Sequence, residues 1–271
     1  MMPVEEINGT PLSYEETGDG EPLVLVHGSW GEGDTWGFVV PGLAESFRVV
    51  AYDRRGHGRS SGPPEEGTVH DDVADLVALI EKLHIAPVNL VANSYGACIA
   101  LRLTAQQPEL VRRTAAHEPP SMPLLAADPD AKPVFDQTAA SLEVVRQLLE
   151  AGNYADAAER FVETIALGPG MWSQLPPEMR DMFVRHAPTV LGEMRDPDAL
   201  TIDLPALGRV STPLLLSKGD QSPPMFAPII EQLARALPDA QRHTFAGAGH
   251  VPQLTHPDDY VTVITSFVQS T

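Results

Sequence analysis

Ser94 occupies a position where a serine side chain can do chemistry. It follows the apolar run "VNLVA" (88–92), which predicts a buried strand, and precedes "YGACIALRLTAQQP" (95–108), which predicts a helix that ends near its proline. A serine at such a junction either caps the helix with its hydroxyl or exposes that hydroxyl as a nucleophile. Small residues at Ala92 and Gly96 would let strand and helix approach closely, as a nucleophile elbow requires, although the elbow pattern has glycine at both positions.

A serine hydroxyl is a poor nucleophile until a base takes its proton. The chain has nine histidines, and His250 has the most suggestive setting. It follows "HTFAGAG", a strand that ends in small residues, and precedes "VPQLTHP". A loop flanked by glycine at the carboxyl end of a strand can hold an imidazole over the edge of a sheet. The sequence therefore favours His250 as the base for Ser94.

The elements around these residues alternate between strands and helices. Apolar runs predict strands within 22–28, 47–60, 88–92, 110–120, 213–220 and 240–250, and helical spacing predicts helices at 68–85, 95–108, 225–238 and 257–269. Such alternation indicates a mostly parallel, twisted sheet covered by helices on both faces, which is an α/β fold.

One long segment departs from this alternation. Between Ser121 and Gly208 the pattern predicts helices, at 134–151, 153–167 and 177–194, and no convincing strand. We therefore expect a core domain made of residues 1–120 and 209–271, with a helical cap inserted at 121–208. The cap should cover the carboxyl edge of the sheet, where open α/β sheets bind their ligands.

Composition narrows the classes of function. The formal net charge of −19 disfavours nucleic-acid binding, and no stretch approaches the roughly 20 apolar residues of a membrane span. "MMPVEEINGT" does not resemble a signal peptide, and the single cysteine, Cys98, allows no disulfide within the chain. We expect a cytoplasmic protein that acts on a small molecule with neither cofactor nor metal ion, since no metal-ligand motif is present. The oligomeric state stays open.

Four motifs in order resemble those of the α/β-hydrolase fold superfamily, and the resemblance extends over nearly the whole chain. "VHGSW" (26–30) resembles the His-Gly oxyanion turn, and "YDRRGHGRS" (52–60) is similar to the Asp-x-Arg-Gly-x-Gly-x-Ser loop. "VANSYGA" (91–97) resembles the nucleophile elbow, with Ala92 as its departure, and "GAGHVPQLTHP" (247–257) looks like the segment of the catalytic histidine.

The resemblance implies a catalytic triad and an oxyanion hole. It places the acid at Asp220, in "LLLSKGDQSPP", so that the chain order is Ser94, Asp220, His250. Glu118, in "AHEPP", competes for that role because some family members carry the acid after the strand that follows the elbow. The oxyanion donors would be the backbone N–H groups of Ser29 and Tyr95.

These residues favour a serine hydrolase, similar to carboxylesterases, that cleaves an ester-like bond through an acyl-enzyme on Ser94. We expect Trp30 to lie below the substrate pocket and Met171 or Trp172 above it, which suits a small or medium, partly apolar substrate. A lactonase or carbon–carbon-bond hydrolase with the same triad stays open, as does a cofactor-free oxygenase. The same fold could also serve as a non-enzymatic receptor or accessory protein.

Overall fold

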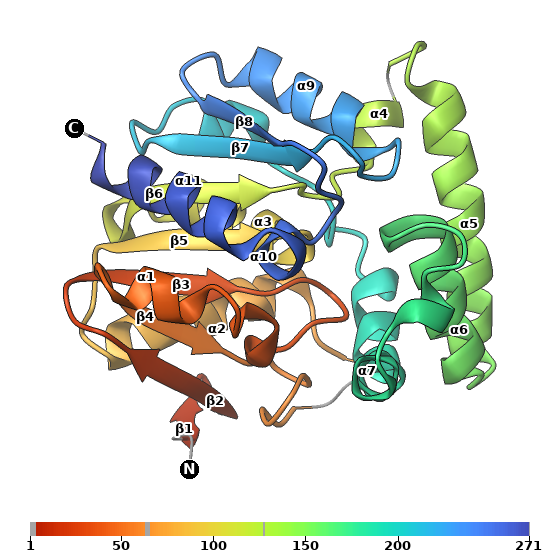
Figure 1. Cartoon of the computed structure of the whole chain (residues 1–271), viewed down its shortest axis with the longest axis horizontal. Helices are drawn as coiled ribbons and strands as arrows, with labels where there is room; N and C mark the ends of the chain where they lie inside the picture. Colours follow the sequence, from red (N-terminus) through yellow and green to blue (C-terminus); the bar gives the residue numbers. More distant parts are fainter. Residues whose placement is uncertain (1–3, 63–65, 127, 271) are drawn as a thin grey trace.

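Figure 1 shows a computed structural model of the chain, which describes residues 4–62, 66–126 and 128–270. Eight strands form one sheet in the order β1-β2-β4-β3-β5-β6-β7-β8. β3 to β8 run parallel, whereas β1 and β2 join one edge antiparallel. The strands are β1 (Val4–Ile7), β2 (Thr10–Thr17), β3 (Glu21–Val26), β4 (Phe47–Tyr52), β5 (Val88–Asn93), β6 (Val111–His117), β7 (Leu214–Gly219) and β8 (Gln241–Phe245). The predicted α/β architecture is confirmed.

Helices cover both faces of this sheet. One face packs on α2 (Val69–Lys82), α3 (Tyr95–Gln106) and α9 (Phe226–Ala236), and the other on α1 (Val40–Ala44) and α11 (Pro257–Gln269). The short helix α10 (Pro252–Thr255) lies between His250 and α11. α2 begins with a complete capping box, in which Thr68 and Asp71 exchange hydrogen bonds. No helix in the described ranges is both long enough and apolar enough to cross a membrane.

The segment between β6 and β7 contains helices and no strand in its described residues, as the sequence predicts. It contains α4 (Pro123–Ala126), α5 (Lys132–Glu150), α6 (Tyr154–Phe161), α7 (Pro177–Arg195) and α8 (Leu204–Leu207), and a π-helical turn, Val162–Ala166, continues α6. In Figure 1, α5, α6 and α7 stand beyond the carboxyl ends of the strands. We call residues 121–208 the helical insertion. Apolar side chains of α5, α6 and α7 form a cluster of their own, which Trp30 of the sheet domain joins. Other apolar side chains of the insertion, such as Leu125 and Leu207, pack in the core of the sheet domain.

The hairpin of β1 and β2 is not among the elements predicted from the sequence. The two strands pair antiparallel across Asn8 and Gly9, and both of these residues have positive φ, at 50° and 75°. Asn-Gly is the dipeptide that two-residue hairpin turns of this backbone shape prefer, so the signal was present in the sequence. β1 is the edge strand and β2 lies between β1 and β4, and neither contains a continuous apolar run like that of β3.

At Gly96, α3 comes very close to the end of β3. A Cβ atom at Gly96 would lie 2.3 Å from the carbonyl oxygen of Val26 and 2.5 Å from that of His27. Both atoms belong to the backbone, so neither can yield without moving a strand end. The expected close approach of strand and helix is thus present, and glycine is required at the last position of the elbow, whereas the first position accepts Ala92, which is fully buried.

Gly96→Ala should therefore lower the free energy of unfolding by about 3 kcal/mol or more, although alanine is the better helix former elsewhere. Gly67→Ala is the matched control, because its Cβ would meet the flexible side chain of Arg55 at 3.3 Å. That change should stay within about 1 kcal/mol. Urea unfolding of both variants measures the difference, and equal stabilities would contradict the steric argument.

Candidate active site

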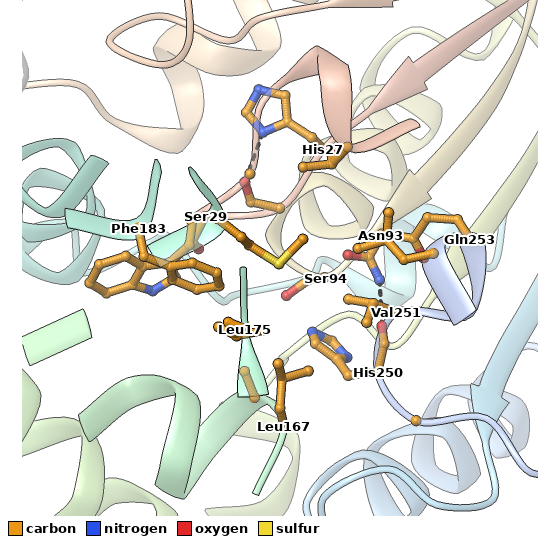
Figure 2. A pocket seen from close by; sticks show the side chains of 18 of the residues that line it. His27, Ser29, Asn93, Ser94, Leu167, Leu175, Phe183, His250, Val251 and Gln253 are labelled. Atoms are coloured by element: carbon orange, nitrogen blue, oxygen red, sulfur yellow. Dashed lines mark hydrogen bonds between the residues drawn. The ribbon is translucent and has the colours of Figure 1, made fainter. Parts of the chain in front are cut away.

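Ser94 stands at the turn between β5 and α3. It is the N-cap residue of α3, yet its side chain makes no capping hydrogen bond, and its backbone has a positive φ of 56°. A positive φ is strained for a residue with a Cβ atom, and such strain is tolerated mainly where function needs it. The structure thus does not support the alternative that Ser94 is a helix cap. Its hydroxyl faces a cavity instead (Figure 2).

His250 faces the same cavity from the loop after β8. Figure 2 shows its ring directed into the space that Ser94 also lines. The ring stacks on Phe226, with 4.3 Å between the ring centroids and 13° between the planes. The backbone carbonyl of His250 accepts a hydrogen bond of 3.0 Å from the side-chain amide of Asn93, the residue before Ser94. The imidazole is therefore held both by its ring and by its backbone.

The acid beside His250 is Glu118. Its Oε2 lies 2.6 Å from Nδ1 of His250, and its Oε1 accepts a hydrogen bond of 2.8 Å from the backbone N–H of Gly219. Glu118 is fully buried and has a positive φ of 46° at the end of β6. Burial by itself raises the pKa of Glu118, but the hydrogen bond with His250 opposes this effect, and the net result is a lowered pKa. Glu118 is thus a carboxylate near neutral pH.

The expectation that Asp220 pairs with His250 is contradicted by this geometry. Asp220 is exposed, and its Oδ1 accepts hydrogen bonds from the backbone N–H of Gly247 at 2.8 Å and from the side chain of Gln221 at 3.2 Å. Asp220 therefore shapes the loop that leads to His250 without touching the imidazole. Glu118, the competing acid in the sequence analysis, occupies the position that Asp220 was expected to fill.

His117 lies beside Glu118 and His250, so three side chains that can bind a metal ion gather here. Ligand atoms of His117, Glu118 and His250 lie within 4.8 Å of one another, a spacing that a metal ion could bridge. The 2.6 Å between His250 and Glu118 is instead the length of a direct hydrogen bond, shorter than the separation of two ligands around a zinc ion. Burial lowers the pKa of His117 to about 4, so its ring is neutral near pH 7.

The loop after β3, residues 27–31, lies against Ser94. A Cβ atom at Gly28 would come within 3.0 Å of Cβ of Ser94, so glycine is needed for this contact. Ser29 lines the space around Ser94 together with Gly28. Tyr95 is the first residue of α3, and the first amide of a helix has no acceptor within that helix. Ser29 and Tyr95, whose backbone amides are expected to form an oxyanion hole, thus both lie close to Ser94.

Two chambers open on either side of Ser94. The α10 chamber has a volume of about 440 Å³ and is lined by α10 and by the insertion residues Met171, Leu175, Met179 and Phe183. The α5 chamber has a volume of about 590 Å³ and is lined by Phe135, Ala139 and Leu142 of α5 and by Met225 and Phe226. Both chambers are bounded by the same central residues, namely Ser29, Trp30, Ser94, Phe161, Ala166 and His250.

The three expected pocket residues have different places. Trp30 lines both chambers and packs against Phe161, with 5.0 Å between ring centroids, so the two rings form the partition between the chambers. Met171 lines the α10 chamber, as expected. Trp172 lines neither chamber, and its ring meets Phe183 edge-on at 6.3 Å, behind the chamber wall. Neighbours on a tight turn point to different sides, which the sequence alone could not resolve.

Sequence reasoning also missed two residues of this site. Asn93 lies inside the elbow motif, and its contact with His250 joins segments 157 positions apart, so no local signal reveals it. Phe226 begins α9, where an aromatic residue is typical of ordinary core packing. Its stacking on His250 depends on the tertiary arrangement alone.

Comparison with known proteins agrees with this fold. Residues 21–257 match the family model of the alpha/beta hydrolase fold. A pimeloyl-[acyl-carrier protein] methyl ester esterase of Chromobacterium violaceum is 31% identical, over 96% of this chain and 98% of that protein. The chain therefore belongs to the α/β-hydrolase family.

Two further comparisons come from a relative and from a solved structure. A pyrrolizixenacetamide deacetylase of Xenorhabdus hominickii is 26% identical, over 98% of this chain and 97% of that protein. The enol-lactonase of Burkholderia xenovorans superposes with a TM-score of 0.80 at 20% identity, over 99% of this chain and all of that one. At that identity the likeness shows the shared fold.

Replacing each of the two competing acids by its amide should separate their roles. Glu118→Gln should lower kcat by about 10³–10⁴-fold, because the amide no longer fixes the tautomer of His250 or stabilises its protonated form. Asp220→Asn keeps an acceptor oxygen for Gly247 and should leave kcat within about fivefold of wild type. Steady-state hydrolysis of an activated ester measures both, and a severe loss in Asp220→Asn with a mild one in Glu118→Gln would restore the original assignment.

Proposed function

We propose that this protein is a serine hydrolase that cleaves an ester-like bond of a small or medium, partly apolar substrate. One observation carries the proposal: the hydroxyl of Ser94 caps no helix and shares its cavity with His250, whose other ring nitrogen is held by the buried carboxylate of Glu118. Nucleophile, base and acid are the parts that acyl transfer requires. We infer that Ser94, His250 and Glu118 form the catalytic triad.

The reaction would proceed in two halves. Oγ of Ser94 attacks the carbonyl carbon while Nε2 of His250 takes its proton, and the same proton then passes to the departing alcohol oxygen. This step leaves an acyl group on Ser94. Water, deprotonated by His250, attacks that acyl group, and the proton returns to Oγ as the acid is released. Glu118 keeps Nδ1 of His250 protonated throughout and stabilises the imidazolium.

The backbone N–H groups of Ser29 and Tyr95 would stabilise the charged oxygen of the tetrahedral intermediate. Support for Tyr95 comes from its place at the start of α3, where the helix dipole also favours negative charge. Support for Ser29 comes from the contact of Gly28 with Ser94. Backbone donors are well suited to this task because the fold fixes their direction before the substrate arrives.

The two chambers suggest a substrate with an apolar group on each side of the scissile bond. Both open at Ser94 and His250, and the ring pair of Trp30 and Phe161 separates them. An acyl group in one chamber and an alcohol group in the other would bring the carbonyl carbon to Ser94. In this arrangement the helical insertion acts as the cap expected from the sequence, since it supplies walls of both chambers.

The names of the relatives support ester or amide hydrolysis. The names of the two similar proteins describe a methyl ester esterase and a deacetylase. Both reactions are acyl transfers to water and fit the same triad. A lactonase or a carbon–carbon-bond hydrolase stays an alternative for this chain, as does a non-catalytic receptor. We also propose a cytoplasmic location. The single cysteine, Cys98, is buried and forms no disulfide, which agrees with a reducing compartment.

A small fluorophosphonate tests the nucleophile directly. It should label wild-type protein at Ser94 with loss of fluoride, and hydrolysis of p-nitrophenyl esters should disappear in parallel. Ser94→Ala should lower both labelling and ester hydrolysis by several orders of magnitude without unfolding the chain. Ser211→Ala, which changes an exposed serine, is the control and should lower neither. A wild-type protein that neither labels nor hydrolyses any ester, lactone or amide of a panel would favour the receptor alternative.

Narrowing one chamber at a time tests the proposed two-armed substrate. Ala139→Phe reduces the α5 chamber and Leu254→Phe the α10 chamber. Each should lower kcat/KM about tenfold for esters extended on one arm, and the two variants should affect opposite arms, because an overfilled pocket costs about 1–3 kcal/mol of binding. Phosphonate labelling should stay within about threefold of wild type. Sensitivity of both variants to the same arm would contradict this division.

A further inference from the structure

Three successive carbonyl groups of the oxyanion loop, residues 27–31, accept hydrogen bonds from buried side chains. The carbonyl of Gly28 accepts from Nη1 of Arg54 at 3.2 Å, and Nδ1 of His27 lies 2.8 Å from it. Nε2 of His57 lies 2.6 Å from the carbonyl of Ser29, and Nδ1 of His186 lies 3.2 Å from that of Trp30. His186 belongs to α7 of the helical insertion.

The protonation of these rings follows from their other contacts. Nε2 of His27 accepts the backbone N–H of Arg54 at 3.0 Å, so the ring carries its proton on Nδ1 and donates to Gly28. Nε2 of His186 likewise accepts the backbone N–H of Gly58 at 3.0 Å, which leaves Nδ1 as the donor to Trp30. Oε2 of Glu32 lies 3.4 Å from that Nε2, and a fully protonated ring would still donate from Nδ1.

A second residue of α7 reaches the same loop through Arg54. The guanidinium of Arg54 is buried, and it pairs with both oxygens of Asp72 at 3.1 Å and with Oε1 of Glu193. Its Cζ lies 4.6 Å from the ring centroid of Tyr95. A buried guanidinium needs paired carboxylates to stay in place, so Glu193 fixes the group that holds the Gly28 carbonyl.

These contacts bear on the direction of the Ser29 amide. A peptide unit is planar and trans, so its N–H points away from its C=O. When the Gly28 carbonyl is drawn toward Arg54 and His27, the N–H of Ser29 must point to the opposite side. Ser29 and Ser94 both line the two chambers. Holding the Gly28 carbonyl thus sets the direction of the amide that would receive the oxyanion, and holding the carbonyls of Ser29 and Trp30 restrains the rest of the loop.

We propose that His186 and Glu193 of α7 are positioning residues for the oxyanion hole, so that the helical insertion holds the catalytic loop in shape as well as enclosing the substrate. His186, Thr189 and Glu193 lie on one face of the helix, and Thr189 adds a hydrogen bond of 2.7 Å to the carbonyl of Gly56. This inference rests on the proposed serine hydrolase function, because it assigns the Ser29 amide to the charged oxygen of that reaction.

A matched pair of substitutions at His186 tests the proposal. Asparagine places its amide donor near the position of Nδ1, whereas glutamine reaches the position of Nε2 and loses the donor to Trp30. His186→Gln should lower kcat about 10–100-fold with KM within about threefold, since the lost contact acts on the transition state. His186→Asn should keep kcat within about threefold of wild type. Glu193→Gln removes the charge that balances Arg54 and should lower kcat several-fold with KM unchanged.

His70→Gln is the control for a contact between core and insertion that does not involve the loop. Nε2 of His70 lies 3.0 Å from Oδ2 of Asp198 at the surface, and this variant should behave as wild type. Phosphonate labelling of Ser94 should slow in His186→Gln and Glu193→Gln alone. Labelling and kcat within about twofold of wild type in both variants would overturn the proposal, whereas a wild-type protein that fails to label refutes the proposed function instead.

Discussion

The contact of Gly96 with the end of β3 is the constraint on which the site depends. The missing side chain lets α3 press its first turn against the carbonyl groups of Val26 and His27. That approach places Ser94 beside Gly28, and it brings the first amide of α3 next to the oxyanion loop. The contact is made by backbone on both sides, so its geometry depends little on side-chain motion. A preorganised site of this kind suits chemistry in which charge develops at a fixed position.

The proposed triad uses the ends of neighbouring parallel strands. β5 ends at Asn93 and β6 ends at His117, and the residue after each strand has a positive φ and directs a functional side chain over the edge of the sheet. Because parallel strands finish at the same edge, Ser94 and Glu118 come close although 24 positions separate them in the chain. The loop after β8 then brings His250 over both. Strain at two adjacent strand ends is borne by the well-packed sheet beneath them.

The helical insertion is coupled to the sheet domain through buried charge and through apolar packing. The side chain of Trp30 extends from the oxyanion loop into the apolar cluster of the insertion, and the side chains of His186 and Glu193 extend from α7 toward that loop. Each part thus places side chains in the other. A substrate that alters the position of α7 would also alter the surroundings of the oxyanion, so binding and catalysis are physically linked in this arrangement.

The sequence by itself determined the fold and singled out Ser94 and His250 as the candidate nucleophile and base, because each depends on a local pattern: alternating apolar runs, a small-residue turn at Ser94, and a glycine-flanked loop before His250. It also contained the Asn8-Gly9 signal for the hairpin that the analysis missed. Only the tertiary structure decided which acid pairs with His250, since Asp220 and Glu118 both follow strands of the same sheet. A strained backbone turned Glu118 inward to a buried position, while Asp220 turned outward to Gly247. The side of the wall on which Met171 and Trp172 lie, and the link from α7 to the oxyanion loop, likewise depend on contacts between distant segments, which no local pattern records.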